Sequence, residues 1–280
     1  MKLVTLDTGR FKLDGGAMFG VVPKSLWNKK NPADENNMCD WALRCLLIED
    51  RNHLIVIDSG IGNKQDDKFY SYYHLSQTKS IADLLAESGY SVNDVTHHII
   101  THLHFDHCGG SIVMNENGEY VPVFPNAQYI ISSQQWSLAN EPNPREKASF
   151  ISNNITPLAK AKELTMITQD SKLSDRISFK LVNGHTSGMI IPHILVEEKT
   201  IVFAADLFPS HWHLTMPWVM AYDTQPLVTL KEKEHHLKIA VRDNYYLFYE
   251  HDPIMELSNV IQKEKGINVG ESYKLTELLS

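Results

Sequence analysis

The chain has little positive charge for its length and no long hydrophobic run. Among its 280 residues, 26 lysines and arginines stand against 34 aspartates and glutamates, so the formal net charge is −8. A protein that binds a nucleic-acid backbone usually carries a basic surface, and this charge therefore argues against nucleic acid as a partner. No stretch of about 18 apolar residues occurs, so we expect neither a membrane-spanning helix nor a membrane partner.

Cysteine is also scarce. The chain has three, Cys39, Cys45 and Cys108, which form neither an even set nor a zinc or redox spacing. Such usage is typical of a reducing compartment, where a buried thiol behaves as a small hydrophobic side chain. The first residues also lack the apolar stretch of a secretory signal. We therefore expect a cytoplasmic protein.

The pattern of extended and helical segments indicates the fold class. We expect strands at residues 41–48, 53–57, 98–101, 128–131, 177–182, 189–196, 200–204 and 245–249, and helices at 80–87, 133–140, 227–239 and 253–263. Pro192 predicts an edge or a bulge for its strand. Runs of strands with helices between them predict an α/β protein with two sheets. We expect one domain over residues 1–280, whose first 40 residues form an irregular leader.

Histidine is the residue in surplus, with 14 in the chain. Three of them lie in the segment T-H-L-H-F-D-H-C-G-G at residues 101–110, directly after an apolar strand. Residues two apart on an extended backbone share a face, so His102 and His104 can bind one metal ion. Imidazole is a good ligand for zinc and for similar divalent ions.

The second half of this segment predicts further ligands. Asp106 and His107 are adjacent and would diverge on a strand, but they can converge on a second ion if the chain turns there. Gly109 and Gly110 would supply the backbone freedom for that turn. The segment therefore predicts a metal site with more than one ion.

This H-x-H-x-D-H segment resembles the signature of the metallo-β-lactamase-fold hydrolases. In that family the signature follows a strand, and further ligands occur downstream at strand ends. Here those positions are His185, Asp206 and His251. The resemblance covers residues 41–252 and implies a four-layer αββα sandwich, in which two mixed sheets are flanked by helices.

The resemblance also implies two bound divalent ions, most simply zinc, with manganese, iron and cobalt accepting the same ligands. It divides the ligands into two sets joined by a bridging carboxylate: His102, His104 and His185 on one ion, Asp106, His107 and His251 on the other, and Asp206 on both. Asp58 matches an acidic family position that supports the ligands, since ligating imidazoles commonly donate their other N–H to a carboxylate.

Such a site predicts metal-assisted hydrolysis. A bound metal lowers the pKa of water to about 7, so hydroxide can attack a carbonyl or phosphoryl group at neutral pH. Asp106 is the expected catalytic residue that carries a proton to the leaving alkoxide. We therefore expect an enzyme, a hydrolase of ester bonds in EC class 3.1.

The leader and two later segments resemble the branch of quorum-quenching N-acyl-homoserine lactonases and methyl-parathion-hydrolase-like enzymes. These segments are residues 14–24, 205–209 and 218–223, and the family leader covers the active site. The resemblance places six residues at the substrate pocket: Met18, Phe19, Val21, Phe208, His211 and Tyr222. Apolar side chains there would suit an acyl chain or an aromatic leaving group, with core packing as the alternative.

One departure from the lactonases keeps other substrates open. Those enzymes carry a tyrosine shortly after the bridging aspartate, whereas this chain has Leu207, Phe208 and Pro209. Tyr222 could replace that phenol. We therefore expect a lactonase, and keep as alternatives a phosphotriesterase or arylesterase with the same site and a non-catalytic metal- and ligand-binding protein. The resemblance also favours a homodimer, while the physiological substrate is left open.

The remaining histidines have no place in this pattern. We expect structural roles in the core or at the surface for His53, His74, His97, His98, His193, His235 and His236. His211 and His213 follow the bridging aspartate closely, and either could reach the substrate.

Overall fold

The structure is a computed structural model that describes residues 1–264 and 266–279. Its strands are β1 Lys2–Asp14, β2 Met38–Asp50, β3 His53–Ile57, β4 His97–Ile99, β5 Ile112–Met114, β6 Tyr120–Pro122, β7 Gln128–Ser132, β8 Glu163–Ile167, β9 Ser171–Lys172, β10 Ile177–Val182, β11 Met189–Val196, β12 Lys199–Phe203, β13 Tyr246–Phe248, β14 Leu257–Lys263 and β15 Gly266–Tyr273.

The helices are α1 Gly15–Phe19, α2 Lys24–Trp27, α3 Asp67–Ser71, α4 Ile81–Glu87, α5 Phe105–Cys108, α6 Ser133–Asn140, α7 Ser152–Ile155, α8 Pro226–Arg242 and α9 Leu275–Leu278. Four short 3₁₀ helices complete the set: η1 Gly109–Ser111, η2 Thr156–Lys160, η3 Ala205–Leu207 and η4 His211–Leu214. Among the described residues, none of these helices is long and apolar enough to cross a membrane.

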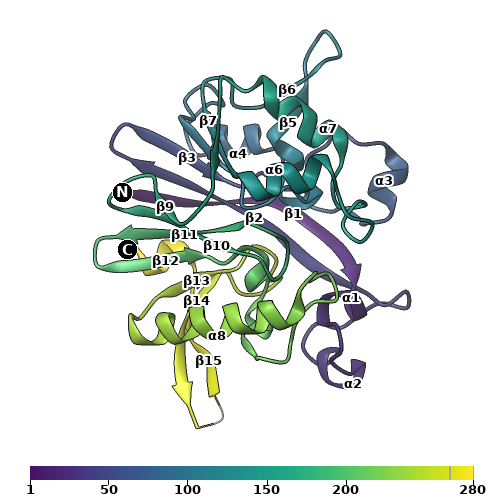
Figure 1. The fold of residues 1–280 in the computed structure, drawn as a ribbon, viewed down its shortest axis with the longest axis vertical. Coiled ribbons are helices and arrows are strands. Elements are labelled where there is room, and N and C mark those ends of the chain that lie inside the picture. The colour runs from purple at the N-terminus through teal and green to yellow at the C-terminus, as the bar shows by residue number, and fades with distance from the viewer. Residues whose placement is uncertain (265, 280) are drawn as a thin grey trace. The chain divides into compact units, whose positions relative to one another are not determined.

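The strands form two large mixed sheets (Figure 1). One has the order β1-β2-β3-β4-β7-β8, the other has the order β15-β14-β13-β12-β11-β10-β9, and β5 pairs with β6. In the first sheet β2 and β3 are antiparallel, whereas β3, β4, β7 and β8 run parallel. In the second sheet β12 and β13 are parallel and β13 and β14 antiparallel. These sheets and helices confirm the predicted mixed α/β class.

The chain divides into two compact units. Unit 1 comprises Met1–Gly9, Leu43–Gln169 and Gly188–Ile190, and unit 2 comprises Arg10–Ala42, Asp170–Ser187 and Ile191–Ser280. Each is described by itself below. The single domain remains a prediction.

In unit 1, the parallel strands determine where the polar side chains are. The β2–β3 hairpin closes through two residues, Arg51 and Asn52, and Arg51 has the left-handed φ of 57° that such tight turns use. Ser80 is the N-cap of α4, and its Oγ accepts from the Asp83 backbone N–H. Since β3 and β4 run parallel, their carboxyl ends lie at one edge, where Asp58 and His102 follow.

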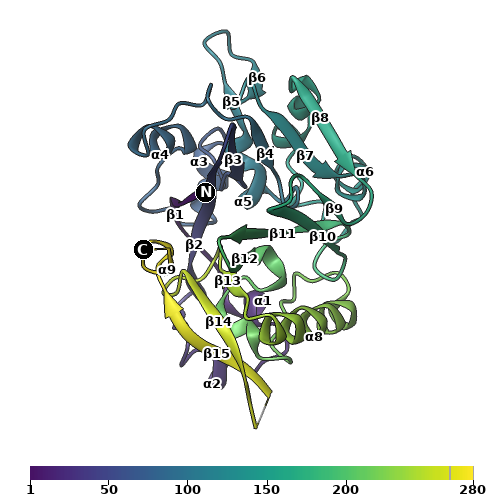
Figure 2. The same ribbon diagram turned by 90° about the vertical axis from the view of Figure 1, so that its left-hand side faces the viewer.

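In unit 2, the 17-residue helix α8 contacts β14, and β14 and β15 are the two long yellow strands in Figure 2. β12 and β13 are parallel, in the register Val202 to Leu247, so their carboxyl ends also lie at one edge. Asp206 follows the first of these strands and His251 follows the second.

Two segments differ from the sequence prediction. Residues 253–263 were expected to be helical, but β14 pairs there with β13 and β15, and strand pairing overrides the local helical pattern. The leader is not irregular, because its first residues form β1, which lies beside β2, and Asp14 caps α1 by accepting from Ala17 N.

For Pro192 the expected edge is wrong, and the alternative, a bulge, remains a prediction. Its strand β11 lies between β10 and β12 and is therefore not an edge strand. The register with β12 begins at His193, so the missing N–H of Pro192 falls just outside the paired residues.

Candidate metal centre

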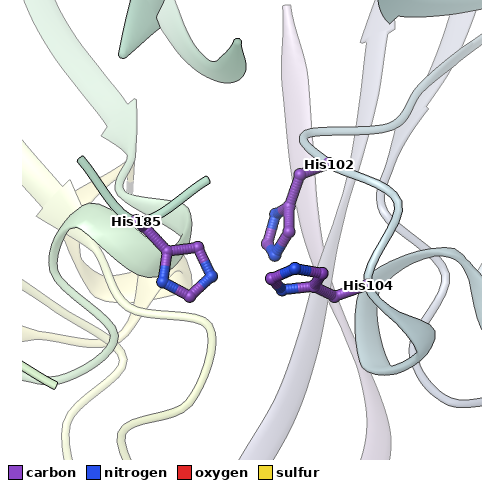
Figure 3. A group of neighbouring side chains, drawn as sticks. All are labelled: His102, His104 and His185. Atoms are coloured by element: carbon purple, nitrogen blue, oxygen red, sulfur yellow. The ribbon is translucent and has the colours of Figure 1, made fainter. Parts of the chain in front are cut away.

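The predicted histidine segment of unit 1 changes from extended chain to helix at His104. His104 caps α5, so His102 and His104 precede the helix while Asp106 and His107 lie on it. Figure 3 shows the His102 and His104 rings side by side, with centroids 4.5 Å apart. The His102 and His107 rings are 3.9 Å apart, and both are fully buried. Asp106 and His107 could converge on one ion only if the chain turned here, and the chain does turn at this point.

Asp58 holds this segment in place. Its Oδ1 accepts from the Thr101 backbone N–H at 2.7 Å, and its Oδ2 accepts from the Thr101 hydroxyl at 2.6 Å and from His107 Nδ1 at 3.1 Å. An ionised carboxylate only accepts, so His107 carries its proton on Nδ1. The Nε2 lone pair of His107 is then available as a metal ligand.

The same reasoning applies to His102. Because the Thr101 hydroxyl donates to Asp58, its oxygen accepts from His102 Nδ1, which is 3.1 Å away. His102 therefore also presents Nε2 as its ligand nitrogen. A ring nitrogen of His102 lies within 4.8 Å of a ring nitrogen of His104 and of one of His107. A ring nitrogen of His107 also lies within 4.8 Å of an Asp106 carboxylate oxygen.

Gly109 and Gly110 serve this segment in a way that the sequence did not predict. Gly109 has an ordinary helical φ of −58°, so conformational freedom is not the reason for glycine there. A Cβ at Gly109 would lie 2.1 Å from the Ile61 carbonyl oxygen, and one at Gly110 would lie 2.1 Å from the Ser59 carbonyl oxygen. The two glycines are needed because the backbone segments approach each other closely.

Sequence reasoning missed Glu146. Its Oε1 is 3.7 Å from His104 Nε2, and its side chain is 5% exposed. Glu146 lies in the segment E-P-N-P-R-E-K, whose composition predicts only a polar loop. Nothing in that pattern signals a buried carboxylate.

In unit 2, one carboxylate faces two imidazoles. Asp206 Oδ1 is 3.2 Å from His251 Nε2, and Asp206 Oδ2 is 3.2 Å from His185 Nε2. The other ring nitrogens are engaged, since His251 Nδ1 donates to the Ala42 carbonyl oxygen at 2.8 Å and His185 Nδ1 bonds Asp223 Oδ1 at 2.9 Å. The Asp206 carboxylate has one imidazole Nε2 near each of its oxygens, and this arrangement suits a carboxylate that bridges two metal ions.

Asp223 is a second residue that the sequence did not single out. It is 2% exposed and orients the His185 ring. The family-like segment 218–223 contains it, but Asp223 lies 38 positions from His185, so the sequence does not indicate their contact.

The predicted pocket residues fall into two groups. Met18, Phe19 and Phe208 are 1%, 0% and 1% exposed, and the Phe19 ring is stacked in an aromatic cluster. Their place at the substrate pocket remains a prediction, with core packing as the alternative. Val21 and Tyr222 are 92% and 39% exposed, and their place at a substrate pocket remains a prediction.

His211 and His213, which follow Asp206 closely, form hydrogen bonds within the protein. His211 donates its backbone N–H to Asp252 Oδ2 at 2.8 Å, and its ring also contacts that carboxylate. His213 is buried, with Nε2 2.9 Å from the Met18 carbonyl oxygen. Burial lowers the pKa of His213 to about 4. His213 is therefore held by the backbone of the leader, and a role for it at the substrate remains a prediction.

The chain is similar to known proteins in sequence and in fold. A model of the metallo-beta-lactamase superfamily matches residues 43–232. The solved structure of a probable metal-dependent hydrolase from Staphylococcus aureus is similar, with a TM-score of 0.87 and 27% identity over 98% of each chain. AidC, a dizinc quorum-quenching lactonase solved with the product N-hexnoyl-L-homoserine, has a TM-score of 0.78 and 22% identity over 97% of this chain and 95% of its own. An N-acyl homoserine lactonase of Bacillus cereus is 21% identical over 97% of this chain and 98% of its own.

Proposed function

The chain belongs to the metallo-beta-lactamase superfamily, and from this membership we propose that it is a dinuclear metal-dependent hydrolase of a lactone or a related ester. The proposal rests on the hydrogen bonds of the imidazole rings. His102, His107, His185 and His251 each have Nδ1 in a hydrogen bond, which leaves Nε2 to face a metal.

We propose the ligand sets that the family resemblance implies, with zinc as the first candidate for the metal. His102, His104 and His185 would hold one ion, Asp106, His107 and His251 would hold the second, and Asp206 would contribute to both. The donor chemistry supports this division, because neutral imidazole and carboxylate are the ligands that such ions prefer. Ions held there would lower the pKa of bound water and polarise the carbonyl or phosphoryl oxygen of the substrate.

The chain's own residues supply the remaining functions. Asp58 and Asp223 hold the rings of His107 and His185 in one orientation. Asp106 is 8% exposed, with Oδ2 3.9 Å from His107 Nε2, so its carboxylate lies beside the ligands and keeps some access to solvent. In the proposed reaction Asp106 carries a proton to the leaving alkoxide oxygen.

The lactonases among the relatives support a lactone as the substrate. The second candidate substrate is a phosphotriester or an aryl ester. It is supported by the residues after Asp206, since Leu207, Phe208 and Pro209 include no tyrosine. Tyr222 is exposed and adjacent to Asp223, which holds His185, so its phenol is the candidate to hydrogen-bond the substrate carbonyl.

The decisive experiment compares turnover by the parent and by ligand variants. We expect His102→Ala and Asp206→Ala to abolish lactone hydrolysis while circular dichroism shows a folded chain, and Asp67→Ala, at an exposed residue, to keep full activity. Equal turnover by the parent and the ligand variants would end the proposal.

The substrate class is decided by kcat/KM on purified, zinc-loaded protein. We expect higher values for N-acyl-homoserine lactones than for aryl esters and paraoxon-like phosphotriesters. The reverse order would establish the second candidate. Stoichiometric retention of the lactone without product release would instead indicate a metal- and ligand-binding protein without catalysis.

A further inference from the structure

We propose that Glu232 and Lys233, neighbours on α8, are positioning residues for His185. Glu232 acts on the backbone that carries His185, and Lys233 acts on the segment that leads to Asp223, the hydrogen-bond partner of the His185 ring. The inference rests on the proposed function to the extent that His185 is taken as a metal ligand.

The Glu232 carboxylate holds the backbone directly before His185. One of its oxygens accepts from the Asn183 N–H at 2.7 Å, and the other accepts from the Gly184 N–H at 2.9 Å. Hydrogen bonds to an ionised acceptor are about twice as strong as neutral ones. Both carboxylate oxygens are therefore used on two consecutive peptide groups.

The carbonyl groups of the same segment are held as well. Gln225 N donates to the Gly184 oxygen at 2.9 Å, and Thr224 N donates to the His185 oxygen at 3.0 Å. Gly184 also lies so close to α8 that an added Cβ would be 2.4 Å from the Thr229 nitrogen. The N–H groups of the segment therefore bond to Glu232 within α8, and its carbonyl groups bond to the two residues just before that helix.

Lys233 holds a second segment from the same turn of the helix. It is 1% exposed, and its Nζ donates to three carbonyl oxygens, those of Thr215 at 3.1 Å, Met216 at 3.2 Å and Trp218 at 2.8 Å. An ammonium group has three donors, so all of them are used. This segment leads five residues later to Asp223, which bonds the His185 ring.

The two contacts together determine where His185 Nε2 lies. The backbone position sets the origin of the side chain, and the bond from Nδ1 to Asp223 sets the rotation of the ring. The backbone position and the ring rotation are both fixed through contacts with one 17-residue helix, α8, which is more rigid than a loop. Residues that orient a metal ligand in this way typically change metal affinity by about 10- to 100-fold when they are removed.

The first test measures zinc affinity by competition with a chromophoric chelator. We expect Glu232→Ala to weaken binding about 10-fold or more, and Glu232→Gln to fall between, because its amide keeps one acceptor oxygen. The matched control is Glu234→Ala on the same helix, where the carboxylate is exposed and pairs only with Lys238 among the described ion pairs. We expect the control to match the parent.

The second test needs no metal. In metal-free protein, NMR of the ring N–H groups follows the His185 Nδ1 proton, which the bond to Asp223 protects from exchange with water. We expect that proton to exchange at least about 10-fold faster in Lys233→Met and in Glu232→Ala than in the controls Lys238→Met and Glu234→Ala, since loss of an orienting contact opens the site locally.

The outcomes separate this inference from the proposed function. Zinc affinity and Nδ1 exchange that match the controls, in variants that remain folded, would overturn the positioning role. A parent protein that binds no zinc would refute the proposed function, and Nδ1 exchange would still decide the positioning role. If Glu232→Ala does not fold, Glu232→Gln and its loss of one acceptor decide the first test.

Discussion

Four buried imidazoles share one arrangement at the residue scale. Each engages Nδ1 with an oxygen, and that oxygen comes from a different source in each case: a hydroxyl for His102, the Asp58 carboxylate for His107, a second carboxylate for His185 and a backbone carbonyl for His251. The ring orientation is therefore set before any metal binds. No common sequence motif could encode partners of such different kinds.

His98 differs from these four imidazoles because both of its ring nitrogens are hydrogen-bonded within the protein. It is fully buried, its Nδ1 donates to the Val56 carbonyl oxygen at 3.0 Å, and its Nε2 accepts from the Ser111 hydroxyl at 2.8 Å. Neutral imidazole satisfies both contacts, and burial lowers the pKa of His98 to about 4 from an ordinary 6.5. This confirms the structural role expected for His98.

The lowered pKa predicts a dependence of stability on pH. Above pH 6.5 His98 is neutral in both the folded and the unfolded chain, so it contributes no pH dependence there. Between about pH 6.5 and about pH 4 the unfolded chain binds the proton first, and the free energy of unfolding falls by up to about 3 kcal/mol as the pH decreases. We expect urea unfolding of His98→Gln to lose part of this slope, whereas the exposed His235→Gln keeps it. An identical slope in His98→Gln and the parent would contradict the assignment.

At the scale of the element, α5 depends on close backbone contact more than on its own length. It has four residues, too few for a stable isolated helix, and its His107 carbonyl oxygen accepts from the Ser59 N–H at 2.9 Å. The Gly110 N–H in turn donates to the Gly60 oxygen at 3.0 Å. The segment 59–61 thereby holds the short helix that carries Asp106 and His107.

This contact predicts the effect of a single methyl group. Gly109→Ala would place Cβ 2.1 Å from the Ile61 carbonyl oxygen, so a backbone segment has to move. We expect a loss of about 1–3 kcal/mol in the free energy of unfolding, measured by urea denaturation, together with weaker zinc binding. Gly118→Ala is the comparison, because its Cβ meets no atom within 4 Å and only its φ of +78° is strained. A larger loss in Gly118→Ala than in Gly109→Ala would refute the close-approach explanation.

At the scale of the whole molecule, the similarity to relatives extends over nearly the entire chain, 98% of it for the hydrolase from Staphylococcus aureus. The proposed ligands are spread over residues 102–251 and over both units. The three cysteines are buried and form no disulfide among the described residues, and the cytoplasmic location remains a prediction.

The spread of the ligands predicts that metal stabilises the folded chain. An unfolded chain cannot gather ligands so far apart in sequence, so zinc binds the folded state preferentially. At a free zinc concentration about 1,000 times the Kd, the gain is about 4 kcal/mol. We expect a chelator to lower the Tm and added zinc, but not calcium, to restore it, with no such response in Asp206→Ala. A Tm that is indifferent to chelator would count against a metal site of the folded chain.

The sequence by itself determined the α/β class, most of the strands, and helices α4, α6 and α8, because the patterns of apolar residues and caps that specify these elements are local. It also marked the signature at residues 102–107, where the ligands lie within six positions. The helix expected at 253–263 was wrong because strand pairing with distant residues decides that segment.

Only the tertiary structure decided which side chains support the histidines. Asp223 lies 38 residues from His185, Asp58 lies 49 residues from His107, and Glu232 lies 49 residues from Asn183. It also showed that Gly109 and Gly110 make room for a neighbouring backbone. Such contacts depend on how separate strands and helices meet, and no pattern within one segment carries that information.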